Sequence, residues 1–137
     1  MKFHLFIPFI FCLNACSNGE LSDAEGSEVP YAKGKEIYDR SCVLCHQESG
    51  LGIPDLYPPL AQSDYLLKDK YRLIRNIAFG LEGEIIVNGV GYNSIMPPQV
   101  LNAEEIMNVS NYVLNTWGNK AGEVSIEDVE TILKETN

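Results

Sequence analysis

The stretch Cys42-Val43-Leu44-Cys45-His46 decides how the rest of this sequence is interpreted. Its two thiols are three positions apart, so each can add to one of the two vinyl groups on neighbouring rings of a haem. The histidine that directly follows the second thiol would then lie beneath the ring, where its imidazole can bind iron. This spacing predicts one covalently attached haem c, bound through Cys42 and Cys45, with His46 as an axial ligand of the iron.

Three other kinds of site remain open for the same residues. A thioredoxin-like thiol pair would need a βαβ context, and none precedes residue 42. A structural zinc site needs four ligands, whereas only the two cysteines and His46 are available once His4 leaves with an N-terminal signal. A surface disulfide would leave His46 without a role. We therefore favour haem over these alternatives.

A second axial ligand is expected if the iron exchanges electrons without exchanging ligands. Beyond the signal segment the sequence has no second histidine, and its methionines are Met96 and Met107. Met107 falls inside a predicted amphipathic helix and is interpreted as a packing residue. Met96 is followed by Pro97 and Pro98, which disfavour helical backbone and stiffen the loop. We predict Met96 as the second axial ligand; the alternative is that it only packs in the core.

The first fifteen residues have the pattern of a secretory signal peptide. Lys2 is followed by an apolar run that is shorter than the about 20 residues a membrane span needs. The run ends in Leu13-Asn14-Ala15-Cys16, which resembles the lipobox of bacterial lipoproteins, although Asn14 departs from its favoured residues. We expect Cys16 to become the lipid-modified first residue and to anchor the protein to a bacterial membrane. Ordinary cleavage nearby, with Cys16 free or in a disulfide, is the alternative.

Composition divides the remaining chain into three parts. Residues 16–29 are rich in Ser, Gly and acidic side chains and predict a flexible, solvated tether. Residues 30–118 are the expected folded domain, and 119–137 a C-terminal extension with a short helix. Without residues 1–15 the chain has nine basic and nineteen acidic residues, a formal charge of −10. This charge argues against nucleic acid as a partner and favours docking on a basic patch of a redox protein.

The hydrophobic pattern predicts an all-α fold with a minor β-hairpin. Beginning near Pro30, Tyr31, Gly34, Tyr38 and Cys42 recur on one face of a first helix. A second helix is expected over 69–79, ended by a left-handed Gly80, with four residues facing inward: Leu73, Ile74, Ile77 and Ala78. Within 85–92, Asn88-Gly89 has the signature of a two-residue hairpin turn.

Two further helices are marked by their first residues. Asn102 and Glu105 form a capping-box pattern for a helix that we expect to end at Gly118. One face of this helix would carry Ile106, Val109, Val113 and Trp117. Ser125 and Asp128 form a second capping-box pattern, which predicts a last short helix to about residue 134.

Taken together, these motifs resemble the class I cytochromes c over roughly residues 30–117. The resemblance rests on CVLCH at 42–46, PPL at 58–60, IMPP at 95–98 and the amphipathic helix that follows. The segments 57–66, 87–98 and 116–119 further resemble a variant found in cytochrome subunits of periplasmic dehydrogenases and beside copper nitrite reductases. The resemblance implies a cytochrome c fold of short helices around one covalently bound haem, with His46 and Met96 on its iron.

The resemblance also implies roles for residues around the haem. Pro58, two before Leu60, would offer its carbonyl to His46, which fixes the imidazole tautomer. Gly34 and Tyr38 would contact the last core helix at Val109 and Tyr112. Apart from the resemblance, four residues are expected as walls of the haem pocket, with plain core packing as the alternative for each: Leu44, Leu60, Tyr92 and Ile95.

The functional expectation is a one-electron carrier on the periplasmic side of a membrane, with no enzymatic activity of its own. No acid–base pair or nucleophile accompanies the haem motif. The expected partners are a dehydrogenase, a copper nitrite reductase or a terminal oxidase. Two alternatives stay open: an electron-entry subunit of a membrane-associated oxidoreductase complex, and a gas-binding haem sensor in which Met96 is absent from the iron or easily displaced.

Overall fold

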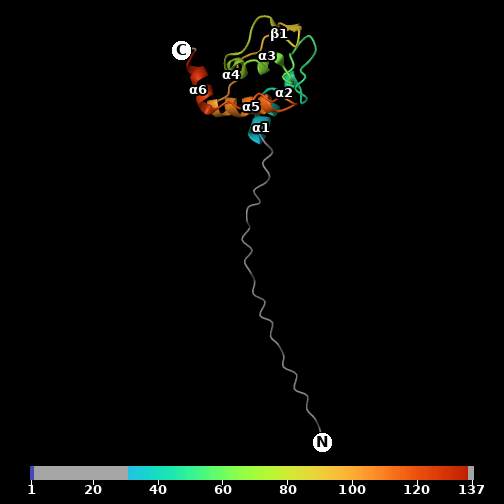
Figure 1. Ribbon diagram of the computed structural model, residues 1–137, viewed down its shortest axis with the longest axis vertical. Coiled ribbons are helices and arrows are strands. Elements are labelled where there is room, and N and C mark those ends of the chain that lie inside the picture. Colours follow the sequence, from blue (N-terminus) through green and yellow to red (C-terminus); the bar gives the residue numbers. More distant parts are fainter. Residues whose placement is uncertain (2–30, 136–137) are drawn as a thin grey trace.

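A computed structural model describes residues 1 and 31–135, so the predicted signal peptide, Cys16 and the tether lie outside the described residues. The elements are α1 (Ala32–Ser41), α2 (Val43–His46), α3 (Asp64–Leu67), α4 (Lys70–Phe79), β1 (Ile85–Val87), β2 (Val90–Tyr92), α5 (Ala103–Asn115) and α6 (Ile126–Lys134) (Figure 1). The predicted architecture, short helices with a minor hairpin, is confirmed.

The packing of α1 against α5 forms the base of the domain. Gly34 allows this close crossing, because a Cβ atom there would lie 2.2 Å from the carbonyl oxygen of Asn108. Next to the crossing, the ring of Tyr38 lies 5.4 Å from that of Tyr112, centroid to centroid. Val109, on α5, is fully buried. The predicted contact between the first helix and the last core helix is therefore present.

Helix α4 supplies the opposite wall of the core. Its N-cap Asp69 accepts a hydrogen bond from the backbone of Tyr71, which satisfies one free N–H of the first turn. Of the four residues expected to face inward, three are buried and Ala78 is partly buried: Leu73, Ile74 and Ile77 are the buried ones. Gly80 does follow the helix with a positive φ of 78°, but its ψ of −175° is extended rather than left-handed helical.

Helix α5 has the predicted capping box but ends earlier than predicted. Its last residue is Asn115, not the residue before Gly118. Thr116 is extended and its hydroxyl donates to the carbonyl of Tyr112 at 2.6 Å, while Trp117 has a φ of 53°. This turn carries the Trp117 ring back onto Tyr38, at 5.1 Å between centroids. A helical continuation would have projected that side chain elsewhere.

The hairpin and the last helix agree with their sequence signatures. Strands β1 and β2 pair antiparallel, and Asn88 and Gly89 both have positive φ, as a type I′ turn requires. Helix α6 begins with the Ser125–Asp128 capping box and packs against α4 and α5. In the described part of the chain, no helix is both long and apolar enough to cross a bilayer.

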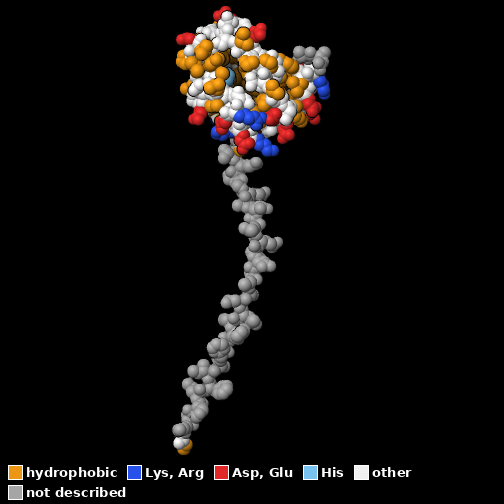
Figure 2. All heavy atoms as spheres, turned by 180° about the vertical axis from the view of Figure 1, so that it is seen from behind, with side chains coloured by type: hydrophobic (Ala, Val, Ile, Leu, Met, Phe, Trp, Pro, Cys, Tyr) orange, Lys and Arg blue, Asp and Glu red, His pale blue; other side chains and the backbone are white. Residues whose placement is uncertain are grey.

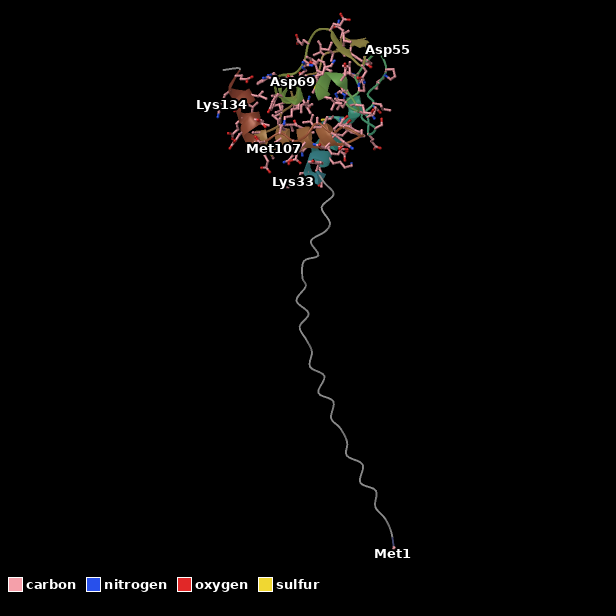
Figure 3. The ribbon with its side chains drawn as sticks, viewed as in Figure 1. Met1, Lys33, Asp55, Asp69, Met107 and Lys134 are labelled. Carbon is pink, nitrogen blue, oxygen red and sulfur yellow. The ribbon has the colours of Figure 1, made fainter. Side chains whose placement is uncertain are left out.

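Figure 3 places the main landmarks at the edges of the domain. Lys33 lies on α1 at one side, and Asp55, in the loop after α2, lies at the opposite side. Lys134 marks the end of α6, at the flank away from the hairpin. The loop that contains Asp55 and the hairpin therefore lie together on the side far from the start of α1.

Candidate haem site

An apolar cavity of about 310 Å³ lies among α2, α4, the hairpin and the loop that carries Met96. This volume is at the low end of the range of roughly 300–1,000 Å³ typical of ligand pockets. Every pocket residue predicted from the sequence lines it: Cys42, Leu44, Cys45, His46, Pro58, Leu60, Tyr92, Ile95 and Met96. Figure 2 shows its mouth as a hollow framed by hydrophobic side chains, with histidine visible inside.

The position of His46 is fixed by the loop that follows it. Its Nδ1 lies 3.1 Å from the carbonyl oxygen of Pro58. Because a carbonyl only accepts, Nδ1 carries the proton and donates, and Nε2 keeps its lone pair. Burial lowers the pKa of His46, with the hydrogen bond to Pro58 opposing the shift. Burial thus favours the neutral imidazole, and the bond to Pro58 favours the tautomer whose Nε2 is free to bind a metal.

Gly52 makes this arrangement of the loop possible, although no motif in the sequence distinguishes it from the other glycines. Its backbone N–H donates to the carbonyl of His46 at 3.1 Å. A Cβ atom at this position would lie 2.2 Å from the carbonyl oxygen of Tyr57 and 2.7 Å from that of Pro58. A side chain at residue 52 would thus displace the carbonyl that orients the imidazole.

Trp117 and Asn119, from the turn after α5, form hydrogen bonds to the backbone of the same loop. The indole Nε1 donates to the carbonyl of Glu48 at 2.9 Å. Asn119 is buried, and its amide accepts from the backbone of Gln62 at 2.7 Å and donates to the carbonyl of Leu60 at 3.0 Å. The family resemblance assigns no role to residues 116–119; in the structure Trp117 and Asn119 of this segment hold residues 48–62 in place.

Met96 is fixed by backbone hydrogen bonds to the end of α4. Leu81 and Met96 exchange two of them, at 2.8 and 2.9 Å, and Gln99 donates to the carbonyl of Ile77 at 2.9 Å. Gly80 allows this approach, because a Cβ atom there would lie 2.6 Å from the carbonyl oxygen of Met96. Met107 does not line the cavity and packs against the core from α5, as predicted.

The two cysteines are free thiols and both line the cavity. Burial, with a smaller contribution from Cys45, raises the pKa of the Cys42 thiol to about 11. A thiol–disulfide exchange pair depends on a lowered pKa instead. Among residues 31–135, no three His, Cys, Asp or Glu side chains are grouped to hold a metal ion. Both observations favour haem attachment over the thioredoxin-like and zinc alternatives.

The chemistry of the cavity fits a haem. Its walls are mostly apolar, which suits a porphyrin ring, and none of its lining residues is Asp, Glu, Lys or Arg. The lining combines two thiols three positions apart, an imidazole with a free Nε2, and a thioether. These are the groups that attach haem c and bind its iron in cytochromes.

Comparison with known proteins gives the same class. Residues 31–117 match the family model of cytochrome c. The chain therefore belongs to the cytochrome c family, whose members carry electrons on a covalently bound haem c rather than convert a substrate. The match to the family model ends at Trp117, in the turn after α5, and therefore leaves α6 outside the matched range.

Individual relatives are carriers or subunits of larger enzymes. The chain is 40% identical over 98 residues to cytochrome c-552 of Thermus thermophilus, which covers 68% of this chain and 66% of that protein. It is 31% identical over 121 residues to the cytochrome c subunit of a quinone-dependent alcohol dehydrogenase of Gluconacetobacter polyoxogenes. It is 29% identical over 106 residues to the fructose dehydrogenase cytochrome subunit of Gluconobacter japonicus. These alignments cover 85% and 72% of this chain but only 25% and 21% of the two subunits.

Proposed function

We propose that this protein is a one-electron carrier in which Cys42 and Cys45 form the two thioethers to haem and His46 and Met96 bind its iron. A haem bound in this way supplies reversible one-electron exchange between Fe(II) and Fe(III). The protein's part is to hold both ligands, exclude water and set the reduction potential. The observation that carries the proposal is that all four side chains line one apolar cavity.

The backbone around each ligand supports retention of both during electron transfer. His46 is held through Pro58 and Met96 through Leu81. A thioether ligand stabilises ferrous iron, and apolar walls disfavour the additional charge on ferric iron, so both raise the reduction potential. The two backbone hydrogen bonds between Met96 and Leu81 also argue against a gas sensor, because a sensor needs a distal ligand that leaves the iron easily.

A second candidate function is an electron-entry subunit of a larger oxidoreductase. It is favoured by the similarity to cytochrome subunits of alcohol and fructose dehydrogenases. A dehydrogenase is therefore the partner class with most support; a copper nitrite reductase or a terminal oxidase rests on the sequence resemblance alone. In each case we propose a basic docking patch on the partner, because the chain is strongly acidic.

Export and membrane attachment complete the proposal. Covalent haem attachment fits an exported chain, and the segment that ends in Cys16 fits a lipoprotein signal. In this proposal residues 1–15 are removed, Cys16 holds lipid, and 16–29 tether the domain on the periplasmic side or outside. Labelling with a radioactive fatty acid tests the anchor, and Cys16→Ala should release haem-containing protein from the membrane fraction.

The haem proposal is tested by expression in cells that attach haem c in their periplasm. We expect a Soret band that survives denaturation and acid-acetone extraction, with one haem per chain. Cys42→Ala and Cys45→Ala should each leave one thioether, and the double variant should lose its haem on extraction. A colourless protein with both thiols free would contradict the proposal.

A further inference from the structure

Asn76 is a buried polar residue in a cavity whose walls are otherwise mainly apolar. It lies on α4 with Leu73 and Ile77, at the helical spacing that places all three residues in the cavity lining. Its neighbours on this face are apolar and buried. An asparagine here therefore needs an explanation that core packing does not give.

Asn76 is only 9% exposed, and its side-chain amide has no hydrogen-bond partner among residues 31–135. The amide is still accessible from the cavity, because the one fully buried side-chain polar atom without a partner in this part of the chain is Ser110 Oγ. The backbone of Asn76 is satisfied, since its carbonyl accepts from Gly80 at 3.0 Å. A primary amide has two N–H donors and an acceptor oxygen. A haem that fills the cavity would cover these groups, and leaving them unpaired would then cost free energy that a leucine avoids. The missing partner is therefore expected on the molecule that the cavity binds.

The acceptors that a haem offers indicate which one that is, because its charged carboxylates are its strongest hydrogen-bond acceptors. Haem has two propionate carboxylates, and the cavity lining includes no Lys or Arg. The titratable groups that do line it are His46, the two thiols and three tyrosines: Tyr57, Tyr65 and Tyr92. Arg72 is next to the lining but occupied, because its guanidinium lies 4.4 Å from the centroid of the Tyr65 ring and donates to the Tyr65 carbonyl at 2.8 Å.

We propose that the side-chain amide of Asn76 donates a hydrogen bond to a propionate carboxylate of the bound haem, which is held without a cationic partner. This inference rests on the haem attachment proposed above. A hydrogen bond to the charged form of a carboxyl group lowers its pKa. Asn76 therefore keeps this propionate ionised without placing a positive charge beside the iron.

The first experiment uses the wild-type ferrous holoprotein, which is diamagnetic when both axial ligands are bound. We expect nuclear Overhauser contacts between the Asn76 amide protons and a propionate methylene group. Contacts to the methyl group of Met96 instead would identify the axial sulfur as the acceptor and overturn the proposal. A protein without haem would refute the proposed function, whereas a haem protein without the propionate contact refutes this inference alone.

Substitutions give an independent readout. Asn76→Leu keeps the approximate shape and should raise the propionate pKa by about one unit, a tenfold change in proton affinity. The pH range in which the reduction potential falls with rising pH should move up by the same amount. Asn76→Asp should raise that pKa further, because it replaces the donor with a like charge. Thr131→Asp, on the exposed face of α6, adds the same charge elsewhere and should leave the pKa unchanged.

A second donor in the cavity provides the contrast. Tyr92 is 8% exposed and lines the cavity, and Tyr92→Phe removes only its hydroxyl. If Tyr92→Phe shifts the propionate pKa and Asn76→Leu does not, the assignment to Asn76 is wrong. A changed near-infrared band of the ferric protein in Asn76→Leu, with an unchanged propionate pKa, would also overturn it.

Discussion

The two methionines beyond the predicted signal segment, Met96 and Met107, lie in different surroundings once the chain is folded. Met96 lines the cavity from a loop held by backbone hydrogen bonds to Leu81, whereas Met107 packs against the core from α5. A ligand needs both the right atom and a fixed position, because an immobilised thioether pays little ordering entropy on binding iron. The pair therefore allows a controlled test of axial ligation.

We expect Met96→Ala to keep its covalent haem but to lose the near-infrared thioether-to-iron band of the ferric protein. Its reduction potential should fall by on the order of 0.1–0.2 V, within the roughly 0.8 V range that axial ligands set. Met107→Ala is the matched control, since it removes the same side chain from outside the cavity. It should lower stability and leave the band and the potential in place. A normal band in Met96→Ala would exclude this residue as the ligand.

At the scale of elements, glycines decide how closely segments approach one another. Gly80 and Gly83 both have positive φ, at 78° and 88°. They differ in surroundings: a Cβ atom at Gly80 would press on the Met96 carbonyl oxygen at 2.6 Å, and one at Gly83 would meet nothing within 4 Å. Gly80 is therefore needed both for the close contact and for the positive φ, whereas Gly83 is needed for the positive φ alone.

We therefore expect Gly80→Ala to destabilise the protein by about 2–4 kcal/mol, from backbone strain and overpacking together. Gly83→Ala should cost about 1 kcal/mol from the strain alone. Only Gly80→Ala should weaken the near-infrared band, because it displaces the loop that holds Met96. Urea unfolding and the ferric spectrum check both statements; equal losses in the two variants would contradict the role of the close contact.

The crossing of α1 and α5 allows a second test at this scale. Gly34→Ala would bring a Cβ atom to 2.2 Å from the Asn108 carbonyl oxygen, so one helix must move. We expect a loss of about 2 kcal/mol or more, despite the better helix propensity of alanine. Lys33→Ala, at the exposed neighbouring position, controls for propensity and should change stability little. A stabilised Gly34→Ala would show that the helices are not in close contact.

At the scale of the whole molecule, three carboxylates make the free energy of unfolding depend on pH in the acid range. Backbone N–H groups lower the pKa of Asp64 through Asn88, of Glu105 through Asn102 and of Asp128 through Ser125, each as the largest cause. A lowered folded-state pKa adds stability above the ordinary value, 3.8 for Asp and 4.5 for Glu, and this stability is lost as the pH falls through the folded pKa.

We expect Asp64→Ala to be less stable than the wild type at pH 6, and the difference to shrink as the pH falls below 3.8. The reason is that protonation of Asp64 weakens its bond from the Asn88 N–H, at 2.7 Å, which joins α3 to the hairpin turn. Taking the difference between two proteins removes the common effect of net charge. Urea unfolding at several pH values measures it; a difference that grows with acidification would refute the linkage.

Net charge controls encounter with partners at the same scale. The full sequence has a formal charge of −9. Raising the ionic strength from about 0.01 M to about 0.5 M should slow electron exchange with a basic partner by tenfold or more, since charges are then screened within a few ångströms. Stopped-flow mixing measures this rate, with a small uncharged reductant as the control. A rate that does not depend on ionic strength would contradict electrostatic steering.

The sequence alone determined the local features of this protein. The thiol spacing, the histidine next to it, the Asn88-Gly89 turn and the two capping boxes all depend on residues within a few positions of each other. The cavity residues followed from motif and resemblance. Steric limits and hydrogen bonding between near neighbours decide such features, so they can be recognised before the chain folds.

The tertiary structure decided what depends on distant segments. It showed that Gly52 and Gly80 make room for carbonyls and that Trp117 leaves the helix to hold the loop at Glu48. It also showed that Asn76 lines the cavity without a side-chain partner among residues 31–135. Each of these features depends on which atoms lie next to the residue in the folded chain, and the residue's own type does not specify those atoms. Close packing fixes these neighbours only once all the helices are in place, because a contact of a few ångströms can join residues that are tens of positions apart.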